Sequence, residues 1–132
     1  MNRYPSKSRG FTLIEMLVVV AIIGILAAVA YPMYAAHLVK GNRGAAQSHL
    51  LELAQAETEY MADARTYADS VAALNVSTPA TVSEYYTIRI EVQEGAPASY
   101  VISATPIAGK RQADDGALSI DSTGKKTPAD KW

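Results

Sequence analysis

The pattern of apolar and polar positions divides the chain near residue 31. Residues 11–31 form a strongly apolar run that contains a single charged residue, Glu15. At about 1.5 Å per residue, such a run is long enough for a helix to cross a bilayer. A carboxylate inside a membrane-length segment is costly and normally marks function. The residues before the run include no acid and three basic side chains, which the positive-inside rule places on the cytoplasmic side: Arg3, Lys7 and Arg9.

After Pro32 the apolar residues recur every three or four positions, which predicts that the helix continues to about Asp63. Proline within a helix removes one hydrogen bond and bends the axis, so we expect one kinked helix of about fifty residues. Its second half, residues 32–63, is expected to be amphipathic. The buried face is predicted to hold Ala46, Leu50, Leu53, Ala54 and Tyr60. The opposite face is predicted to hold Gln47, Glu52, Gln55 and Glu59.

Residues 64–132 replace the helical period with turn signals and short extended segments. Residues 64–84 are expected to form an irregular connection with one helical turn near Ser70–Leu74. Turns at residues 93–99 and 121–124 separate three predicted strands and a final edge segment, namely Tyr85–Val92, Tyr100–Thr105, Gly116–Ile120 and Lys125–Trp132. The predicted fold class is therefore α+β, with a long kinked N-terminal helix packed on a small antiparallel sheet.

Length and charge limit the functions that this pattern allows. Of the 132 residues, roughly 100 remain for one small domain once the basic leader and the apolar run are set aside. The chain has no cysteine, which excludes disulfides and thiolate metal sites. Its net charge is −1, and without the three leader cations nine basic residues face thirteen acidic ones. Bulk electrostatic attraction to nucleic acid is therefore not favoured, although a local basic patch is compatible with this balance.

Two ordinary explanations of the apolar run are a secretory signal and a plain membrane anchor. A secretory signal would place its cleavage site at the small residues 27–30, but its apolar region is normally only about 7–15 residues long. Neither explanation accounts for the glycine immediately before Phe11 or for Glu15 four residues after it.

The residues Gly10, Phe11 and Glu15 resemble the class III signal of type IV prepilins, and Gly24 and Pro32 extend the resemblance. It implies that residues 1–10 are a leader, that a prepilin peptidase cuts after Gly10, and that the new amino group of Phe11 is methylated. It also implies that Glu15 of an incoming subunit meets the Phe11 amine of its neighbour in the filament, with Pro32 also serving assembly. The alternative role for Glu15 is a carboxylate that snorkels to the membrane interface.

The remainder of the chain, residues 64–132, resembles the head of a minor-pilin group that includes a DNA-uptake pilin. The resemblance rests on five features: Tyr85-Tyr86, Tyr100–Ala104, Gln112–Asp115, Gly116–Lys125 and Trp132. That group usually closes its C-terminal loop with a disulfide. Here Gly116 or Ala117 stands near the first cysteine position and Lys131 at the second. We therefore expect strand pairing and packing alone to hold the loop.

The function implied is that of a structural type IV pilus subunit, of the minor kind, in pilus assembly, twitching motility and attachment. Its partners would be other pilin subunits, the prepilin peptidase, the inner-membrane assembly platform and membrane lipid before assembly. It would begin as a single-pass inner-membrane precursor with a periplasmic head and end in the extracellular pilus. A less favoured alternative is a type II secretion pseudopilin.

Another alternative is a DNA-uptake receptor for natural competence. Five basic residues in the C-terminal part are candidate phosphate contacts: Lys110, Arg111, Lys125, Lys126 and Lys131. The simpler interpretation is that they are ordinary surface cations, because four aspartates lie close to them in sequence and offset their charge: Asp114, Asp115, Asp121 and Asp130.

Catalytic and metal-binding motifs give no competing hypothesis. His37 and His49 are expected to be solvated or groove-lining residues, because their spacing on the helix does not support a shared ligand set. The aspartates at 114, 115 and 121 do not follow an EF-hand loop and are expected to form a solvated acidic turn. We therefore predict no enzyme activity, no metal and no cofactor.

Overall fold

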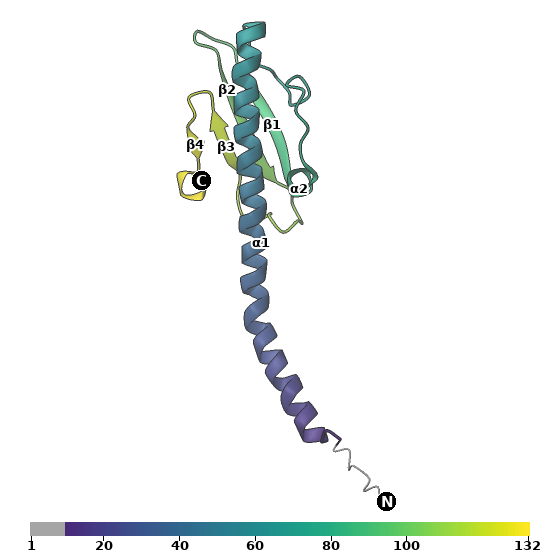
Figure 1. The fold of residues 1–132 in the computed structure, drawn as a ribbon. Helices are drawn as coiled ribbons and strands as arrows, with labels where there is room; N and C mark the ends of the chain where they lie inside the picture. Colours follow the sequence, from purple (N-terminus) through teal and green to yellow (C-terminus); the bar gives the residue numbers. More distant parts are fainter. Residues whose placement is uncertain (1–9) are drawn as a thin grey trace, which may run out of the picture. The chain divides into compact units, whose positions relative to one another are not determined.

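A computed structural model describes residues 10–132 of the chain (Figure 1). The predicted leader therefore lies outside the described residues, apart from Gly10. The chain forms two compact units, one ending at Ala36 and the other running from His37 to Trp132. Helix α1 (Leu13–Ala64) belongs to both units. All other elements belong to the second unit, residues 37–132, which we call the head.

Helix α1 is a single α-helix of 52 residues with Pro32 inside it, which confirms the prediction of one long helix. It ends at Ala64, where Arg65 adopts a φ of 60°. Helices commonly end at a residue in this left-handed region, because it turns the chain away from the helix axis. The buried residues of α1 all lie in the head: Ala46, His49, Leu50, Leu53 and Glu57.

The head contains one antiparallel sheet whose strands follow chain order, β1-β2-β3-β4. Strand β1 (Tyr86–Gln93) pairs with β2 (Ser99–Pro106) along its whole length. Strand β3 (Leu118–Asp121) pairs with β2, and β4 (Lys126–Thr127) pairs with β3. This meander confirms the α+β prediction, and the first three strands lie within one or two residues of their predicted bounds.

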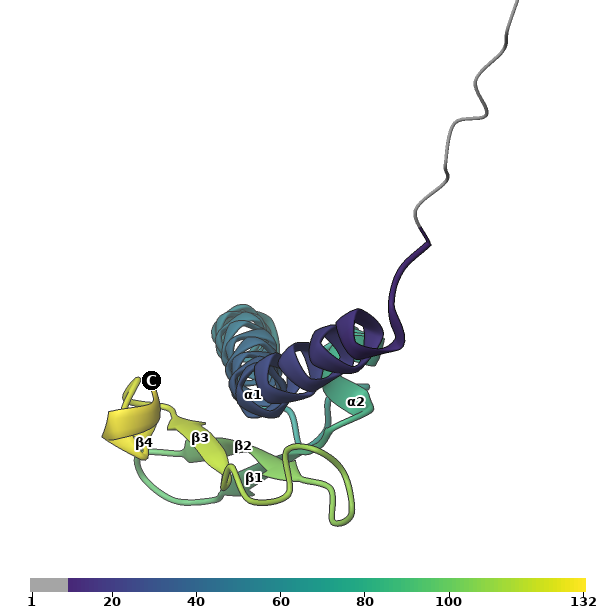
Figure 2. The ribbon, with the colours of Figure 1, turned by 90° about the horizontal axis from the view of Figure 1, so that it is seen from below.

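The core lies between α1 and one face of the sheet (Figure 2). Alternate residues of β2 point into it, because successive side chains of a strand point to opposite faces. The buried positions of α1 fall three or four residues apart, so they form the matching stripe on the helix. The apolar core consists of Ala46, Leu50, Leu53, Val82, Tyr86, Ile90, Tyr100, Ile102, Ala104, Leu118 and Ile120.

Two connections differ from the sequence prediction. A four-residue helix, α2 (Ala80–Ser83), follows Pro79 and buries Val82, although no pattern predicted it. The edge segment predicted for residues 125–132 is wrong beyond β4, because the chain turns into a short 3₁₀ helix, η1 (Ala129–Lys131). Pro128 stands between them and has no N–H to donate, so the strand ladder cannot continue through it.

Candidate assembly and nucleic-acid-binding sites

The first turn of α1 is closed by reciprocal hydrogen bonds between Thr12 and Glu15. The backbone N–H of Glu15 donates to Oγ1 of Thr12 at 3.2 Å. The backbone N–H and the hydroxyl of Thr12 donate to Oε2 of Glu15 at 2.9 and 3.1 Å. This capping box satisfies N–H groups that the start of a helix leaves unpaired. Sequence reasoning missed Thr12, although Thr-x-x-Glu before an apolar run is a recognised signal for the motif.

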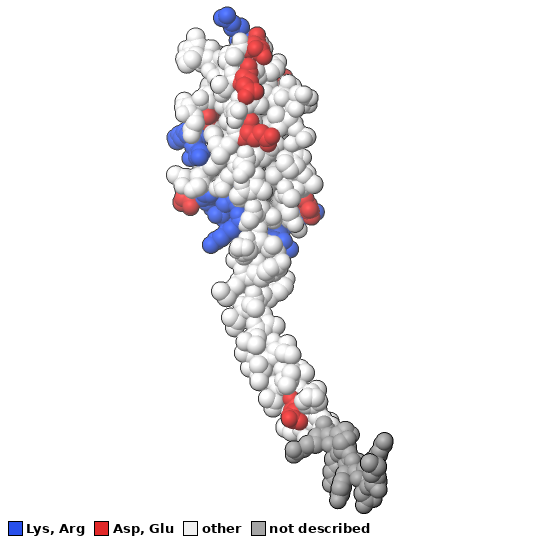
Figure 3. All heavy atoms as spheres, viewed as in Figure 1, with Lys and Arg blue, Asp and Glu red and all other residues white. Residues whose placement is uncertain are grey.

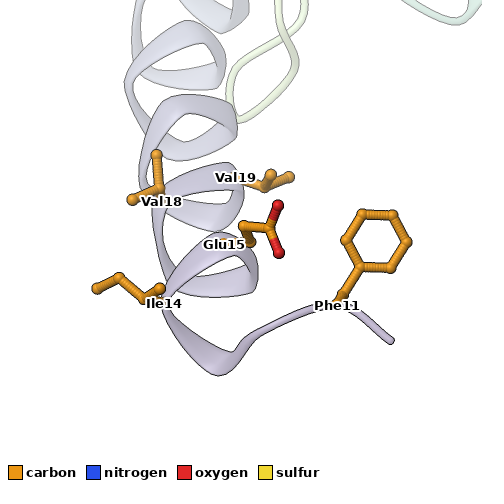
Figure 4. Close-up of a pocket in the computed structure, with 5 residues that line it drawn as sticks. All are labelled: Phe11, Ile14, Glu15, Val18 and Val19. Carbon is orange, nitrogen blue, oxygen red and sulfur yellow. The ribbon is translucent and has the colours of Figure 1, made fainter. Parts of the chain in front are cut away.

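Glu15 also borders a shallow depression of about 290 Å³ beside Phe11 (Figure 4). Figure 4 shows the carboxyl group of Glu15 on the side of the helix that faces the Phe11 ring, with Val18 and Val19 above it. Gly10, Phe11 and Glu15 also line a second, adjoining depression. The structure thus brings together three of the four residues predicted for processing and assembly, without Pro32, while their roles remain predictions.

The apolar half of α1 is exposed on all sides. Every residue from 10 to 34 is exposed, and large side chains such as Leu13 and Val20 keep 83% and 68% of their surface accessible. Among the described residues, α1 is the one helix whose length and composition suffice to cross a membrane. Such a helix suits lipid or other apolar helices rather than water, because the same surface serves both. Pro32 lies within this exposed stretch.

In the head, Arg43 of α1 forms a two-pronged ion pair with Asp115. Nε of Arg43 donates to Oδ2 of Asp115 at 2.9 Å, and Nη2 donates to Oδ1. The Asp115 side chain is 5% exposed and the Arg43 side chain 22%. The hydrogen bonds from Arg43 lower the pKa of Asp115, and the same carboxylate raises the pKa of Arg43. The pair therefore stays ionised and joins the segment before β3 to α1.

Gln112 ties the same segment to α1 and β1. It is fully buried, and its Nε2 donates to the hydroxyl of Tyr86 at 2.7 Å and to the carbonyl of Val39 at 3.1 Å. Asn42 donates to Oε1 of Gln112 at 3.3 Å. The hydroxyl of Tyr86 donates to Oδ2 of Asp115 at 3.3 Å, and burial raises the pKa of Tyr86. Tyr86 therefore remains a neutral donor within this network.

Lys131 holds the C-terminus to this network. Its ammonium group donates to the backbone carbonyl of Asp115, and the side chain of Gln47 donates to the backbone carbonyl of Lys131. A Cβ atom at Gly116 would lie 3.1 Å from Nζ of Lys131. A charge-assisted hydrogen bond thus connects Lys131 to the residue before Gly116, close to the two positions at which the sequence resemblance implies a disulfide in other heads. We call the set of Arg43, Tyr86, Gln112, Asp115 and Lys131 the C-terminal clasp.

The clasp corrects two sequence expectations. Strand pairing and packing alone do not hold the C-terminal loop, because the clasp adds buried polar contacts. Gln47 does not project fully into solvent, since it is half-buried and bonded to the C-terminal segment. Sequence reasoning could not find these contacts, because their partners lie 16 to 84 positions apart.

The basic residues predicted to contact DNA fall into two exposed pairs and the half-buried Lys131. Lys110 and Arg111 precede Gln112, whose bond to Val39 places them beside α1 at the start of the head. Lys125 and Lys126 lie in the β3–β4 hairpin, where Nζ of Lys126 is 5.0 Å from the ring centre of Trp132. Figure 3 shows basic side chains gathered at the end of the head where α1 enters it. The ammonium of Lys131 is already bonded to Asp115.

Two further predictions about polar residues need correction. His37 is exposed, but His49 is buried and lies 3.1 Å from Glu52 and 3.2 Å from Thr78 through its ring nitrogens. A solvated role for His49 is therefore wrong. Its position one turn before Leu53 on the buried stripe was the available signal.

The expected solvated acidic turn is also wrong for Asp115, which is buried in the clasp. Asp114 is exposed, and Asp121 accepts hydrogen bonds from Thr123 and Lys125 that shape the β3–β4 turn. These bonds lower the pKa of Asp121. In residues 10–132, no group of three or more histidine, cysteine, aspartate or glutamate side chains is placed to hold a metal ion.

An exposed apolar helix that continues into an amphipathic half packed on an antiparallel meander is the fold of a type IV pilin. Residues 5–31 match the prokaryotic N-terminal methylation motif. Residues 32–119 match the family described as type IV minor pilin ComP, DNA uptake sequence receptor. The chain therefore belongs to this family of type IV pilins.

Curated relatives include pilins from distant bacteria. The chain is 33% identical over 109 residues to the type IV major pilin protein PilE1 of Neisseria gonorrhoeae, covering 78% of this chain and 65% of that protein. It is 38% identical over 69 residues to the type IV major pilin protein PilA of Myxococcus xanthus, covering 52% and 31%. It is 39% identical over 81 residues to the type IV wide pilus major component PilA4 of Thermus thermophilus, covering 58% and 62%. The chain thus spans less than two thirds of each of these relatives.

Proposed function

We propose that this chain is a structural subunit of a type IV pilus, of the minor kind, which assembles with other pilins and serves twitching motility and attachment. The observation that carries the proposal is the position of Phe11 and Glu15 beside the start of α1, whose apolar half is exposed on all sides. Membership of a pilin family described as minor supports it. Several relatives are named as major pilins, so the choice between the two kinds requires a measurement.

The copy number of the chain in filaments decides between a minor and a major subunit. Filaments would be sheared from cells, purified and analysed by mass spectrometry with isotope-labelled peptides from the head as standards. The proposal predicts a signal well below that of another pilin in the same filaments. If this chain were the dominant subunit, the minor role would be wrong and the head surface would form most of the fibre exterior.

The proposed route to the filament starts with a single-pass precursor in the inner membrane, with its head in the periplasm. The prepilin peptidase would cut after Gly10 and methylate Phe11, and the assembly platform would then move the subunit into the fibre. Gly10 supports this route, because it is exposed, precedes α1 and has open space around its α-carbon. We assign no catalysis to the chain itself, in keeping with a family of structural pilins.

A second candidate function is DNA capture at the pilus surface, which the description of the matched family favours. Lys110 and Arg111 are exposed and lie within the matched residues 32–119, whereas the other three predicted contacts lie beyond them. Lys110 and Arg111 are therefore the first residues to test as phosphate contacts.

The test is duplex-DNA binding by the full chain in detergent micelles over a range of salt concentrations. Affinity should fall steeply with salt, and replacing Lys110 and Arg111 by Gln should reduce the slope by about one per residue. Arg89→Gln is the matched control, since Arg89 is an exposed cation on β1 that lies 3.7 Å from Glu91. An unchanged slope in the double variant would argue against DNA contact at these residues.

A further inference from the structure

The head contains a pocket, separate from the clasp, at the end where α1 stops and the β1–β2 turn lies (Figure 1). It has a volume of about 460 Å³. Tyr60 of α1, Tyr67 and Asp69 of the following loop, and Val92 and Glu94 of the β1 end form most of its lining. Three separate segments therefore converge on one concave surface, which we call the distal pocket.

The aromatic side of the distal pocket is held in place by the core. The rings of Tyr67 and Tyr100 form a T-shaped pair, with ring centres 4.8 Å apart and an interplanar angle of 76°. Tyr100 is itself buried in the core, so the Tyr67 ring is supported from behind. Tyr60 and Tyr67 are both half-buried, which leaves part of each ring available to a ligand.

The charged side chains that line the distal pocket are all acidic. Asp69 and Glu94 are exposed carboxylates, and no lysine or arginine is among the residues that line the pocket. Arg65, the nearest basic residue in sequence, is not part of the lining. Figure 3 shows acidic side chains along the adjoining part of α1, with a basic side chain at the tip of the head.

A buried carboxyl group stands behind the pocket wall. Glu57 is fully buried, and its Oε2 accepts a hydrogen bond of 2.9 Å from the backbone N–H of Ala68, a lining residue. Within the described part of the chain, its Oε1 has no hydrogen-bond partner. A buried oxygen without a partner is unusual in folded proteins, so this wall has an unsatisfied hydrogen-bonding group.

We propose that the distal pocket binds an organic cation, the guanidinium of arginine or a primary ammonium. Tyrosine faces attract such cations through the ring quadrupole, and two carboxylates supply the opposite charge. A bound metal ion is a poorer fit, because the described residues include no group of ligands able to hold one. The cation is either a basic side chain of a neighbouring protein or a free polyamine, and both offer the same chemistry.

The test is an NMR titration of the full chain in detergent micelles with N-acetyl-argininamide. The expected dissociation constant is on the order of a millimolar, with shifts confined to residues 60, 66–69 and 92–94. N-acetyl-citrullinamide, which is nearly isosteric and uncharged, should bind at least about fivefold more weakly. Equal binding of the two compounds, or shifts spread over the rest of the head, would overturn the proposal.

Variants locate the binding to the pocket. The double variant Asp69→Asn, Glu94→Gln should weaken argininamide binding by roughly tenfold, because both carboxylates lose their charge at nearly constant size. Glu84→Gln removes an exposed carboxylate outside the lining and should leave the affinity unchanged. An unaltered affinity in the double variant would also overturn the proposal. Spermidine, titrated in parallel, points to a free polyamine if it binds more tightly than argininamide and to a protein side chain if it does not.

Discussion

Asp115 is the residue on which the polar contacts of the head converge. Its carboxylate binds Arg43 and Tyr86, and its backbone carbonyl accepts the ammonium of Lys131. It therefore links α1, β1 and the C-terminal segment through one nearly buried residue. A buried charged group without a partner destabilises the folded state. Asp115 therefore matters more for the stability of the head than its exposed neighbour Asp114.

Asp115→Asn should lower the free energy of unfolding of the head by roughly 2–3 kcal/mol at neutral pH, because Arg43 loses its charged partner. The lowered pKa of Asp115 means that its contribution is present above the pKa of the unfolded side chain and is lost as pH falls through the folded value. The gap between variant and parent should therefore close in acid. Denaturation followed by the fluorescence of Trp132, the only tryptophan, measures both effects.

Asp114→Asn is the control for this prediction, since Asp114 is exposed and adjacent in sequence. It should change stability by no more than about 0.5 kcal/mol. Equal losses in the two variants would show that the clasp does not stabilise the head.

The contribution of Glu57 to the stability of the head should depend on pH in the opposite direction. Burial raises the pKa of its carboxyl group, so the folded head binds a proton more tightly than the unfolded chain. Stability associated with Glu57 is therefore complete below the pKa of the unfolded side chain and falls as pH rises through the folded value. Glu57→Gln keeps an acceptor for Ala68 and should remove this decline, so that the variant is more stable than the parent at high pH.

The measurement is the difference in unfolding free energy between Glu57→Gln and the parent over a series of pH values. Glu59→Gln provides the control, because Glu59 is an exposed carboxylate half a turn away on α1. The difference in unfolding free energy between Glu59→Gln and the parent should not change with pH. A flat difference for Glu57→Gln as well would contradict the raised pKa.

At the scale of the elements, α1 is anchored to the sheet by a narrow stripe of buried residues. Leu50 is fully buried in this stripe, whereas the next residue, Leu51, is 43% exposed. Leu50→Ala should cost about 2–5 kcal/mol of head stability, because it removes buried methyl groups and leaves a cavity. Leu51→Ala makes the same chemical change outside the core and should cost much less. Thermal unfolding measures the stability of both variants. Comparable losses of stability would show that Leu50 is not the main contact between α1 and the sheet at this point.

The secondary structure was largely predictable because its signals are periodic and local. The alternation of residues 85–92 sets the position of β1, and the run after Phe11 sets the start of α1. Helix α2 was missed because four residues are too few to show a helical period. The predicted edge segment extends beyond the end of β4 because the prediction leaves out one effect of Pro128. Proline has no N–H to donate, so it ends the strand ladder.

The candidate sites were predictable only where they depend on neighbours in sequence. Gly10, Phe11 and Glu15 belong to one short motif, and the structure places them around one shared depression. The clasp joins Arg43 to Asp115, and the distal pocket joins Tyr60 to Glu94. Such contacts between distant positions leave no local pattern, because they arise only after the sheet packs on α1.

At the scale of the whole molecule, the chain combines an apolar helix that has no core of its own with a head that has one. On the proposed route the apolar half of α1 would contact lipid before assembly and other subunits afterwards, and Glu15 is its one internal charge in either setting. Glu15→Val should leave a processed, membrane-inserted protein that fails to enter filaments. Glu15→Gln retains an oxygen for Thr12 and separates loss of the helix cap from loss of charge. Unimpaired incorporation of both variants would contradict an assembly role for this carboxylate.

The proposed role in the pilus is tested by identifying, by mass spectrometry, the N-terminal peptide of this chain in purified filaments. A pilus subunit processed as proposed yields a peptide that begins at Phe11 and carries one methyl group on its amino terminus. Gly10→Ser should abolish that peptide and leave the leader attached to the membrane-bound protein. Absence of the chain from filaments, or a mature end at a residue other than Phe11, would show that the chain is not a pilus subunit processed in the proposed way.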